Sequence, residues 1–279
     1  MKPINNTVDD LFQPRELAAD EYLNEADGLI YCSKCHTPRQ HRIELKERVF
    51  LPTVRCRCQQ EIYDKEEAER KHQEFLMQVC RLRANGLQDK SLHDYNFAND
   101  KGYNPEIQKA HDYVAHWEEM KANSLGLLLW GDVGTGKSFF AGCIANALLD
   151  KGIPVLMTNF SRILNTLTGM YTDDRNQFID SFNKYSLLII DDLGMERNSE
   201  FAREQVFSVI DSRYRSQLPM IVTTNLSLEE LKDPTDLSRS RIYDRVLERC
   251  MPICVNEQNI RELNQAAVLA QAKQLLSGT

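Results

Sequence analysis

The sequence lacks a long apolar run. No apolar stretch approaches the ~18 residues that a membrane-spanning helix needs, so we expect neither a membrane span nor a membrane partner. The opening residues, MKPINNTVDDLFQPRE, contain no apolar segment of the secretory kind, so no secretory signal is predicted there. Both absences favour a cytoplasmic location, where cysteine clusters are more often metal ligands than disulfides.

A positive net charge is also missing. The chain has 34 Lys and Arg residues against 41 Asp and Glu residues, a net charge of −7. This argues against a protein that coats DNA non-specifically, although a local basic groove is still compatible with it. The length of 279 residues favours roughly two domains. We place an N-terminal domain with a helical linker at residues 1–88 and a second domain at residues 89–279.

What the sequence does contain is a phosphate-binding pattern. Residues 131–138, GDVGTGKS, match G-x-x-x-x-G-K-[ST] between an apolar strand and a helix. Glycines let the loop turn its backbone N–H groups inward, and the helix directs its positive N-terminus at the same place. Lys137 supplies charge for the β- and γ-phosphates, and the Ser138 hydroxyl suits Mg²⁺. The alternative is a chance match. The predicted nucleotide-binding residues are Gly131, Asp132, Val133, Gly134, Thr135, Gly136, Lys137 and Ser138.

Apolar strands and helices alternate around this loop. We predict strands at 127–130, 155–158, 186–192 and 220–225, and helices at 105–121, 160–170, 175–183, 200–215 and 240–249. This order is typical of an α/β fold in which helices cover both faces of a parallel sheet. Ligands in such folds bind at the carboxyl ends of the strands.

Polar residues stand where two of these strands end. Asp191 is suited to hold Mg²⁺ together with Ser138. Asp192 is then the candidate to orient or deprotonate the attacking water, and Asn225 could position that water against the γ-phosphate. A helix cap or a plain loop is the alternative for the acid pair and for the amide. The glycine-rich loop, the two acids and the amide would all lie at one edge of the sheet, which favours a functional site over these alternatives.

Three arginines follow at intervals of four residues. Arg241, Arg245 and Arg249 would lie along one face of a helix. They could form a solvated stripe paired with Asp244 and Glu248. Alternatively, one of them could be an arginine finger that reaches the γ-phosphate of a neighbouring subunit.

Two closely spaced cysteine pairs occupy the N-terminal domain. Cys32-x-x-Cys35 is followed, after 20 intervening residues, by Cys56-x-Cys58. Two thiolates from each side of a β-like segment fit a tetrahedral zinc site, in which the metal replaces a core that so short a segment cannot build. Free thiols are the alternative, and a redox role for the first pair lacks a thioredoxin-like context.

The sequence around these cysteines is less informative. His36 and His41 are not included as ligands, because a lone histidine is more often a surface residue. Residues 29–58 carry seven Lys and Arg against two Asp and Glu, which could favour nucleic acid but more commonly forms a solvated surface. We expect a polar helix over residues 6–27 and a connecting helix over residues 61–83.

Four blocks together identify a resemblance. WGDVGTGKS, LLIIDDLG, IVTTN and SRIYDRVLER, within residues 89–261, resemble the DnaC/DnaI-type replicative helicase loaders and the related IstB transposition ATPases of the AAA+ class. The resemblance implies an AAA+ P-loop core with Walker A at Gly131–Ser138 and Walker B at Asp191 and Asp192, as Mg²⁺ ligand and catalytic acid. The other implied roles are sensor 1 for Asn225, a trans-acting arginine finger for Arg245 or, as second choice, Arg241, and sensor 2 for Arg261.

The resemblance also implies partners. The cysteine domain resembles the amino-terminal module of DnaI-like loaders, which implies contact with the hexameric replicative helicase. IstB-like proteins generally lack such a module, so the cysteines favour a loader. By the same analogy, single-stranded DNA would be contacted by the helical insertion after the second strand, with Phe160 stacking on bases and Arg162 binding phosphate. Phe160 could equally be a core residue.

We therefore expect a Mg²⁺-dependent ATPase that assembles side by side in its ATP-bound state. ATP binding and hydrolysis would act as a switch for delivering the helicase onto single-stranded DNA, and the expected cofactors are ATP, Mg²⁺ and Zn²⁺. The main alternative is an IstB-like transposition helper that remodels a transposase–DNA complex. A small-molecule P-loop kinase would need an arginine-bearing lid, which is not apparent. A DNA-binding module with a degenerate nucleotide site is opposed by the intact Lys137 and Ser138.

Overall fold

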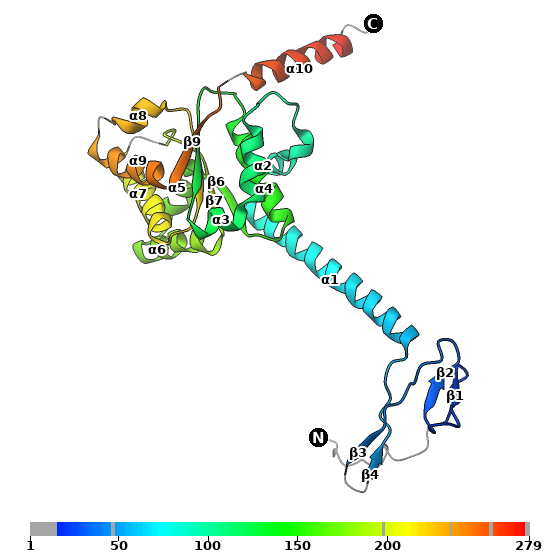
Figure 1. The fold of residues 1–279 in the computed structure, drawn as a ribbon. Helices are drawn as coiled ribbons and strands as arrows, with labels where there is room; N and C mark the ends of the chain where they lie inside the picture. The colour runs from blue at the N-terminus through cyan, green and yellow to red at the C-terminus, as the bar shows by residue number, and fades with distance from the viewer. Residues whose placement is uncertain (1–15, 46–47, 197–198, 235, 257–258, 277–279) are drawn as a thin grey trace. The chain divides into compact units, whose positions relative to one another are not determined.

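The chain divides into two compact units. The computed structural model describes residues 16–45, 48–196, 199–234, 236–256 and 259–276 (Figure 1). The first unit is Met1–Leu76 and the second is Met77–Thr279. The dividing point lies inside helix α1 (Arg57–Gly86), so this helix contributes residues to both units.

The first unit contains two small antiparallel sheets. One pairs β1 (Glu21–Leu23) with β2 (Ile30–Cys32), and the other pairs β3 (Ile43–Leu45) with β4 (Arg48–Phe50). The helix expected over residues 6–27 is therefore wrong, because residues 16–27 form turns and strand β1 and contain no helix; its part at residues 6–15 lies outside the described residues. Tertiary contacts override the local preference for a helix here, because Asp20 and Glu21 bind Arg39, which is distant in the sequence.

Helix α1 is long and mostly exposed. It spans 30 residues, of which only Val79 and Gly86 are buried. The helix predicted over residues 61–83 is present, with about one more turn at its start. Ion pairs one turn apart, such as Glu67 with Lys71 at 2.8 Å, support a helix that has little apolar surface to pack.

The second unit is built on a five-stranded sheet in which every pairing is parallel. The strand order is β6-β7-β8-β5-β9. The strands are β5 (Gly126–Trp130), β6 (Val155–Asn159), β7 (Leu187–Leu193), β8 (Met220–Thr224) and β9 (Cys250–Cys254). The predicted α/β fold with a parallel sheet is confirmed. The unpredicted strand β9 contains Pro252, which an edge strand tolerates because its outer N–H groups need no partner.

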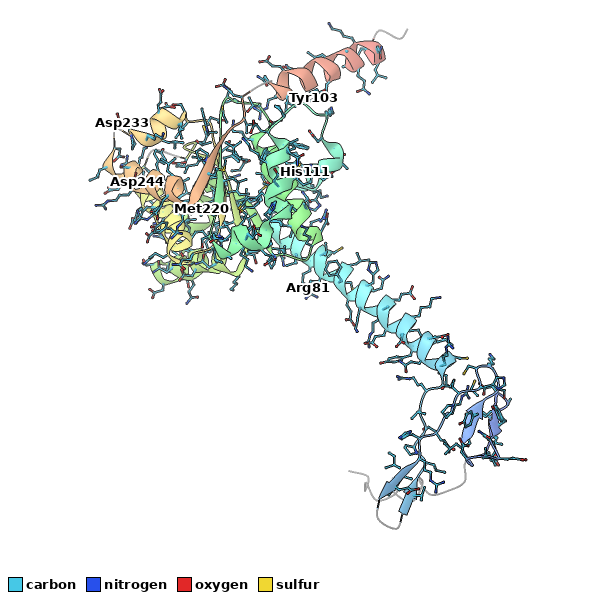
Figure 2. All side chains as sticks on the ribbon, in the orientation of Figure 1. Arg81, Tyr103, His111, Met220, Asp233 and Asp244 are labelled. Carbon is cyan, nitrogen blue, oxygen red and sulfur yellow. The ribbon has the colours of Figure 1, made fainter. Side chains whose placement is uncertain are left out.

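Helices cover both faces of this sheet (Figure 1). Alternate strand residues point to opposite faces, so Leu127 and Leu129 pack in one core and Leu128 in the other. The first core lies beneath α2 (Ile107–Ala115), α3 (Trp117–Ala122) and α4 (Lys137–Asp150). The second lies beneath α5 (Phe160–Thr168), α6 (Thr172–Ser181), α7 (Glu200–Arg215) and α9 (Leu237–Arg249). Side chains fill both layers, and Met220 of β8 belongs to the second (Figure 2).

The predicted helices match these elements with one interruption. The helix expected over residues 105–121 breaks at His116, and the next residue, Trp117, is 3% exposed in the core. Two further helices, α8 (Leu228–Lys232) and α10 (Ile260–Leu276), were not predicted. Among the described residues, no helix is both long and apolar enough to cross a membrane.

Candidate functional site

The glycine-rich pattern forms the loop between β5 and α4. Gly131, Gly134 and Gly136 have φ angles of 140°, 86° and 96°, which residues with a Cβ atom rarely adopt. A Cβ atom on Gly131 would also lie 2.5 Å from the Val255 carbonyl oxygen. The glycines are therefore needed by the backbone itself. The loop leads into the N-terminus of α4, whose N–H groups and dipole favour an anion.

Lys137 folds back over this loop. Its Nζ donates to the carbonyl oxygens of Gly131 at 2.9 Å and Asp132 at 2.6 Å, and the residue is only 5% exposed. Burial lowers the pKa of Lys137, while the nearby carboxylates Asp192 and Asp191 act in the opposite direction. An ammonium that is held by neutral carbonyls keeps its charge for an anionic ligand. Thr135 stabilises the loop by donating to the Asp132 carbonyl at 2.9 Å.

Asp191 and Ser138 lie in direct contact. The Ser138 hydroxyl donates to Asp191 Oδ1 at 2.9 Å, and the Thr223 hydroxyl donates to the same oxygen at 2.6 Å. Burial raises the pKa of Asp191, whereas these two hydrogen bonds lower it. A hydroxyl beside a carboxylate is an oxygen donor set of the kind that Mg²⁺ takes. Thr223 itself was not predicted.

The next residue, Asp192, has an unusual backbone. Its φ angle is 59°, and the β7–β8 pairing shifts register between Ile190 and Leu193. Bulges of this kind often stand beside active sites, where they redirect a side chain. Asp192 lines the cavity beside the glycine-rich loop, whereas Asp191 is not one of its lining residues and contacts Ser138.

A cavity of about 620 Å³ lies at this edge of the sheet. The predicted residues that line it come from the glycine-rich loop, from the ends of β7 and β8 and from the C-terminal segment. They are Val133, Gly134, Gly136, Lys137, Ser138, Asp192, Asn225 and Arg261. The convergence of polar groups at the carboxyl ends of these strands, expected from the order of the motifs, is present.

The opposite wall of the cavity was not predicted. It is formed by the segment before α2, whose lining residues are Asp94, Tyr95, Asn99, Asp100, Lys101, Tyr103 and Asn104. Figure 2 labels Tyr103 in this segment. Asn146 of α4 is 2% exposed, and its amide donates to the carbonyl oxygens of Leu92 and Tyr95 at 2.8 Å each. A polar residue in the middle of an apolar helix was the available signal for this attachment.

The chain after β9 contacts the glycine-rich loop. Asn256 Oδ1 accepts the Asp132 N–H at 2.8 Å. The Arg261 N–H donates to the Gly134 carbonyl at 3.3 Å, at the start of α10. Arg261 also lines the cavity, and its sensor 2 role stays a prediction.

The two candidate finger arginines differ in their surroundings. Arg245 Nε donates to Asp211 Oδ1 of α7 at 2.9 Å, and its guanidinium lies 4.7 Å from the Phe207 ring centroid. Arg241 is exposed, and its guanidinium has no hydrogen bond or ion pair with any described residue. Arg245 therefore holds α9 against α7, while Arg241 is accessible.

The two residues predicted to contact DNA, Phe160 and Arg162, lie in different environments. Phe160 is 1% exposed within the core beneath α5, so its predicted stacking on DNA bases is wrong. The alternative, that Phe160 is a core residue, is correct. Arg162 is on the surface, where it binds Gln88 at 2.9 Å and Asp89 at 2.8 Å. Its contact with phosphate stays a prediction.

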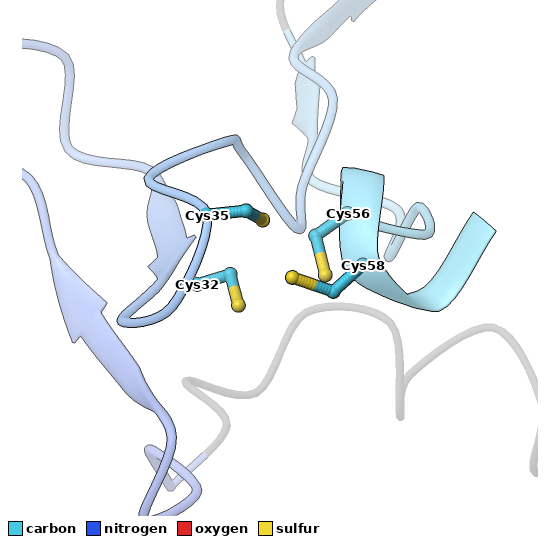
Figure 3. Close-up of side chains that lie close together, drawn as sticks. All are labelled: Cys32, Cys35, Cys56 and Cys58. Atoms are coloured by element: carbon cyan, nitrogen blue, oxygen red, sulfur yellow. The ribbon is translucent and has the colours of Figure 1, made fainter. Parts of the chain in front are cut away.

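The four predicted cysteine ligands meet in one place. Cys32, Cys35, Cys56 and Cys58 point their sulfur atoms toward a common centre, and these atoms all lie within 4.8 Å of one another (Figure 3). A tetrahedral zinc ion with Zn–S bonds of ~2.3 Å would separate its ligand sulfurs by about 3.8 Å. The donor set and spacing thus fit one zinc ion.

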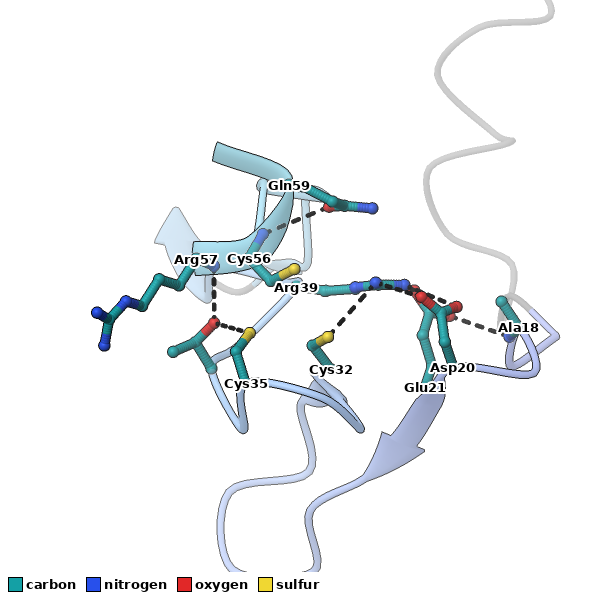
Figure 4. A network of polar contacts seen from close by, with 10 residues as sticks. Ala18, Asp20, Glu21, Cys32, Cys35, Arg39, Cys56, Arg57 and Gln59 are labelled. Carbon is teal, nitrogen blue, oxygen red and sulfur yellow. Dashed lines mark hydrogen bonds and ion pairs between the residues drawn. The ribbon is translucent and has the colours of Figure 1, made fainter. Parts of the chain in front are cut away.

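Hydrogen bonds surround this cluster (Figure 4). Arg39 donates to Cys32 Sγ at 3.5 Å and forms ion pairs with Asp20 at 2.6 Å and Glu21 at 2.9 Å. The Thr37 hydroxyl contacts Cys35 Sγ at 3.1 Å and lowers the pKa of that thiol. Such contacts favour thiolates, which are the form that binds metal.

This chain is similar to known proteins over more than half of its length. Residues 57–267, more than half of the chain, match the family described as IstB-like ATP binding protein. The replicative helicase loader DnaC of Escherichia coli strain K12 is 29% identical over 143 residues, which cover 50% of this chain and 56% of that protein. The replicative helicase loader DnaI of Bacillus subtilis strain 168 is 26% identical over 166 residues, covering 56% of this chain and 53% of that protein. The matches thus span about half the length of each relative.

Solved structures give the same fold. A crystal structure of DnaI superposes with a TM-score of 0.53 at 22% identity, covering 64% of this chain and 99% of that one. A crystal structure of the DnaC helicase loader superposes with a TM-score of 0.50 at 21% identity, covering 60% and 99%. The sheet unit is therefore AAA+-like in fold.

Proposed function

The chain belongs to the family of IstB-like ATP-binding proteins, and we propose that it is an ATPase that delivers a replicative helicase onto single-stranded DNA. The observation that carries the ATPase proposal is the meeting of Lys137, Ser138 and Asp192 at one cavity. Lys137 and Ser138 begin α4, whereas Asp192 comes from the end of β7, so the proximity of the acid to the other two is a property of the fold and not of one short motif.

The residues of this cavity have distinct roles in the proposal. Lys137 exchanges its two loop carbonyls for the β- and γ-phosphate oxygens of ATP. Asp192 orients the attacking water and accepts its proton, and Asn225 holds that water in line with the γ-phosphate. Arg261 contributes positive charge near the same phosphates.

Ser138 and Asp191 would hold Mg²⁺, because their oxygens already lie 2.9 Å apart and Ser138 lines the cavity. When bound, the ion neutralises charge on the phosphate oxygens. The Ser138 hydroxyl now donates to Asp191, and with a metal present its lone pair would be offered to the ion. The Thr223 bond to Asp191 can persist through this change.

Self-assembly supplies the last catalytic group in this proposal. Arg241 is the better placed of the two arginines for a neighbour's γ-phosphate, because Arg245 is already paired with Asp211. Arg245 then serves to position the helix that carries Arg241. A guanidinium from the next protomer lets hydrolysis report assembly, which suits a switch.

The helicase partner rests on two further observations. Both curated relatives described above are named replicative helicase loaders. The four-cysteine cluster gives this chain a second compact unit outside the ATP-binding fold, and we assign helicase contact to that unit.

The proposal is tested with the full chain in two measurements. Wild-type protein is expected to bind ATP and release phosphate, and Lys137→Ala is expected to lose ATP binding by about a hundredfold or more. Lys121→Ala, an exposed lysine on α3, is the matched control and should bind ATP as the wild type does. Unchanged ATP affinity in Lys137→Ala would refute the site.

The partner is tested by co-purification with the hexameric replicative helicase of the same cell. We expect a complex with wild type, and helicase loading onto circular single-stranded DNA that stalls with Lys137→Ala. An ATPase that ignores the helicase but binds a transposase–DNA complex would instead support the transposition helper, which shares the ATP chemistry.

A further inference from the structure

The side chain of Thr223 joins the two acids at the end of β7. The residue is completely buried, at 0% exposure. Its hydroxyl donates to Asp191 Oδ1 at 2.6 Å and accepts the backbone N–H of Asp192 at 2.9 Å. One hydroxyl is therefore bonded to the carboxylate of the first acid and to the backbone of the second.

This double contact follows from the bulge between the strands. The ladder pairs Ile190 with Val222 and then Leu193 with Thr224, so two residues of β7 lie opposite Thr223 alone. A bulge of this kind leaves a backbone group without its ladder partner. The Thr223 hydroxyl takes the Asp192 N–H in place of a backbone carbonyl.

Asp192 needs this support because of its conformation. A φ angle of 59° is costly for a residue other than glycine, and such strain persists only where neighbouring contacts enforce it. Straightening the bulge would shift the register, and a shift of one residue turns a strand side chain to the other face. Asp192 would then leave the cavity.

We propose that Thr223 is a positioning residue for ATP hydrolysis, and that its hydroxyl sets Asp191 for Mg²⁺ and Asp192 for water at the same time. This inference rests on the proposed ATPase function. Lys137 is bonded to loop carbonyls and not to either acid, so nucleotide affinity is independent of Thr223. Removal of the hydroxyl disturbs metal use and turnover together.

Three variants separate this role from a general effect on folding. Thr223→Val removes the hydroxyl but keeps the branched shape, and Thr223→Ser restores the hydroxyl. Thr224→Val is the matched control, because Thr224 is also 0% exposed on β8 but its hydroxyl donates to the Leu193 carbonyl at 2.7 Å and to neither acid. Thermal unfolding of all three proteins establishes that they are folded.

Thr223→Val is expected to lower kcat by about tenfold or more and to raise the Mg²⁺ concentration for half-maximal rate severalfold. Its affinity for ATP in the presence of EDTA should change by less than about threefold. Thr223→Ser and Thr224→Val should stay within about threefold of wild-type kcat. Wild-type turnover and Mg²⁺ dependence in Thr223→Val would overturn the inference.

Hydrogen exchange provides a test that does not depend on activity. The Asp192 amide should be protected in wild type and in Thr223→Ser, and should exchange much faster in Thr223→Val. Equal exchange in wild type and Thr223→Val would overturn the role of Thr223 whatever the ATPase rates are. A wild-type protein that shows the expected protection but no ATP turnover would instead overturn the proposed function.

Discussion

The two units of this chain are stabilised by different means. In the sheet unit, strand residues such as Leu128, Ile189 and Val222 are completely buried between helices. In the described part of the first unit, the buried hydrophobic residues are Ile30, Cys32 and Cys56, and two of these belong to the cysteine cluster. So small a core cannot offset the entropy of folding. We therefore expect a metal held by the cysteines to supply what apolar burial supplies elsewhere.

Among the residues whose burial the structure describes, each unit also buries one arginine, and the two are satisfied differently. Arg39 of the first unit is 6% exposed and binds the carboxylates of Asp20 and Glu21. Arg213 of the sheet unit is 0% exposed, and it contacts no carboxylate among the described residues. Its five N–H groups donate instead to the backbone carbonyls of Phe182, Tyr185, Ser186 and Pro219. Arg39 ties β1 to the cluster, whereas Arg213 fastens the turns that precede β7 and β8.

The largest expected effect is the loss of the metal from the first unit. Cys56→Ser should lose bound zinc and unfold this unit, because zinc binding to such sites contributes ~10 kcal/mol or more to folding. ATP affinity should stay within about threefold, since the cavity is lined by residues of the sheet unit. Zinc content by mass spectrometry, proteolysis of residues 16–76 and ATP titration measure these outcomes.

Cys80→Ser is the control for that experiment, because Cys80 is exposed on α1 and outside the cluster. It should retain zinc and both units. A full complement of zinc in Cys56→Ser would remove the four-cysteine site, and loss of ATP binding would mean that the units are not independent.

The converse experiment disrupts the sheet unit. Arg213→Met removes the guanidinium donor from four carbonyl oxygens, of which, in the described part of the chain, only those of Phe182 and Pro219 also accept a backbone N–H, so the free energy of unfolding should fall by roughly 3–5 kcal/mol. Trp117 and Trp130 are the chain's two tryptophans and both lie in the sheet unit, so fluorescence during urea unfolding reports on that unit alone. Zinc content should not change.

Arg215→Met is the matched control two residues further along α7. Arg215 is 73% exposed in its ion pair with Asp211, and its loss should cost less than about 1 kcal/mol. Equal unfolding curves for the two variants would mean that the carbonyl contacts of Arg213 contribute nothing to the stability of the sheet unit.

The same contrast explains what could be predicted from the sequence. The sheet unit could be predicted from short stretches of sequence. Its buried parallel strands are continuous apolar runs, and the residues of its glycine-rich loop are consecutive in the chain. Leu187–Leu193 shows this well, since four apolar residues followed by two acids indicate both a strand and its functional end. The cysteine spacing was equally informative, because metal ligands come in close pairs.

The misses depend on contacts between distant residues. Strand β1 forms because its neighbours bind Arg39, which lies 18 residues from Glu21. Thr223 is one of two adjacent threonines, and only the bulge in β7 distinguishes it from Thr224. The wall of the cavity near Tyr95 depends on Asn146, which lies 51 residues away. None of these relations leaves a periodic signal in the sequence.

The smallest expected effect on stability is the difference between alanine substitutions of the two α9 arginines, Arg245 and Arg241. Arg245→Ala removes an ion pair with Asp211, in which the two side chains are 27% and 15% exposed, so it should cost about 1–2 kcal/mol. Arg241→Ala should cost less than about 0.5 kcal/mol, because Arg241 is exposed and has no partner among the residues that the structure describes. Urea unfolding followed by tryptophan fluorescence measures both.

We expect the rate of ATP hydrolysis to depend on the two arginines in the opposite order, with the larger loss in Arg241→Ala. Arg241→Ala is expected to bind ATP normally but to lower phosphate release by about tenfold or more in the assembled state, because the γ-phosphate loses a guanidinium from its neighbour. Mixing Arg241→Ala with Lys137→Ala should restore part of the activity, since the second variant supplies Arg241 to the first variant's nucleotide. No recovery in the mixture would mean that Arg241 does not act across a subunit boundary, and full activity in Arg241→Ala alone would return the assignment to Arg245.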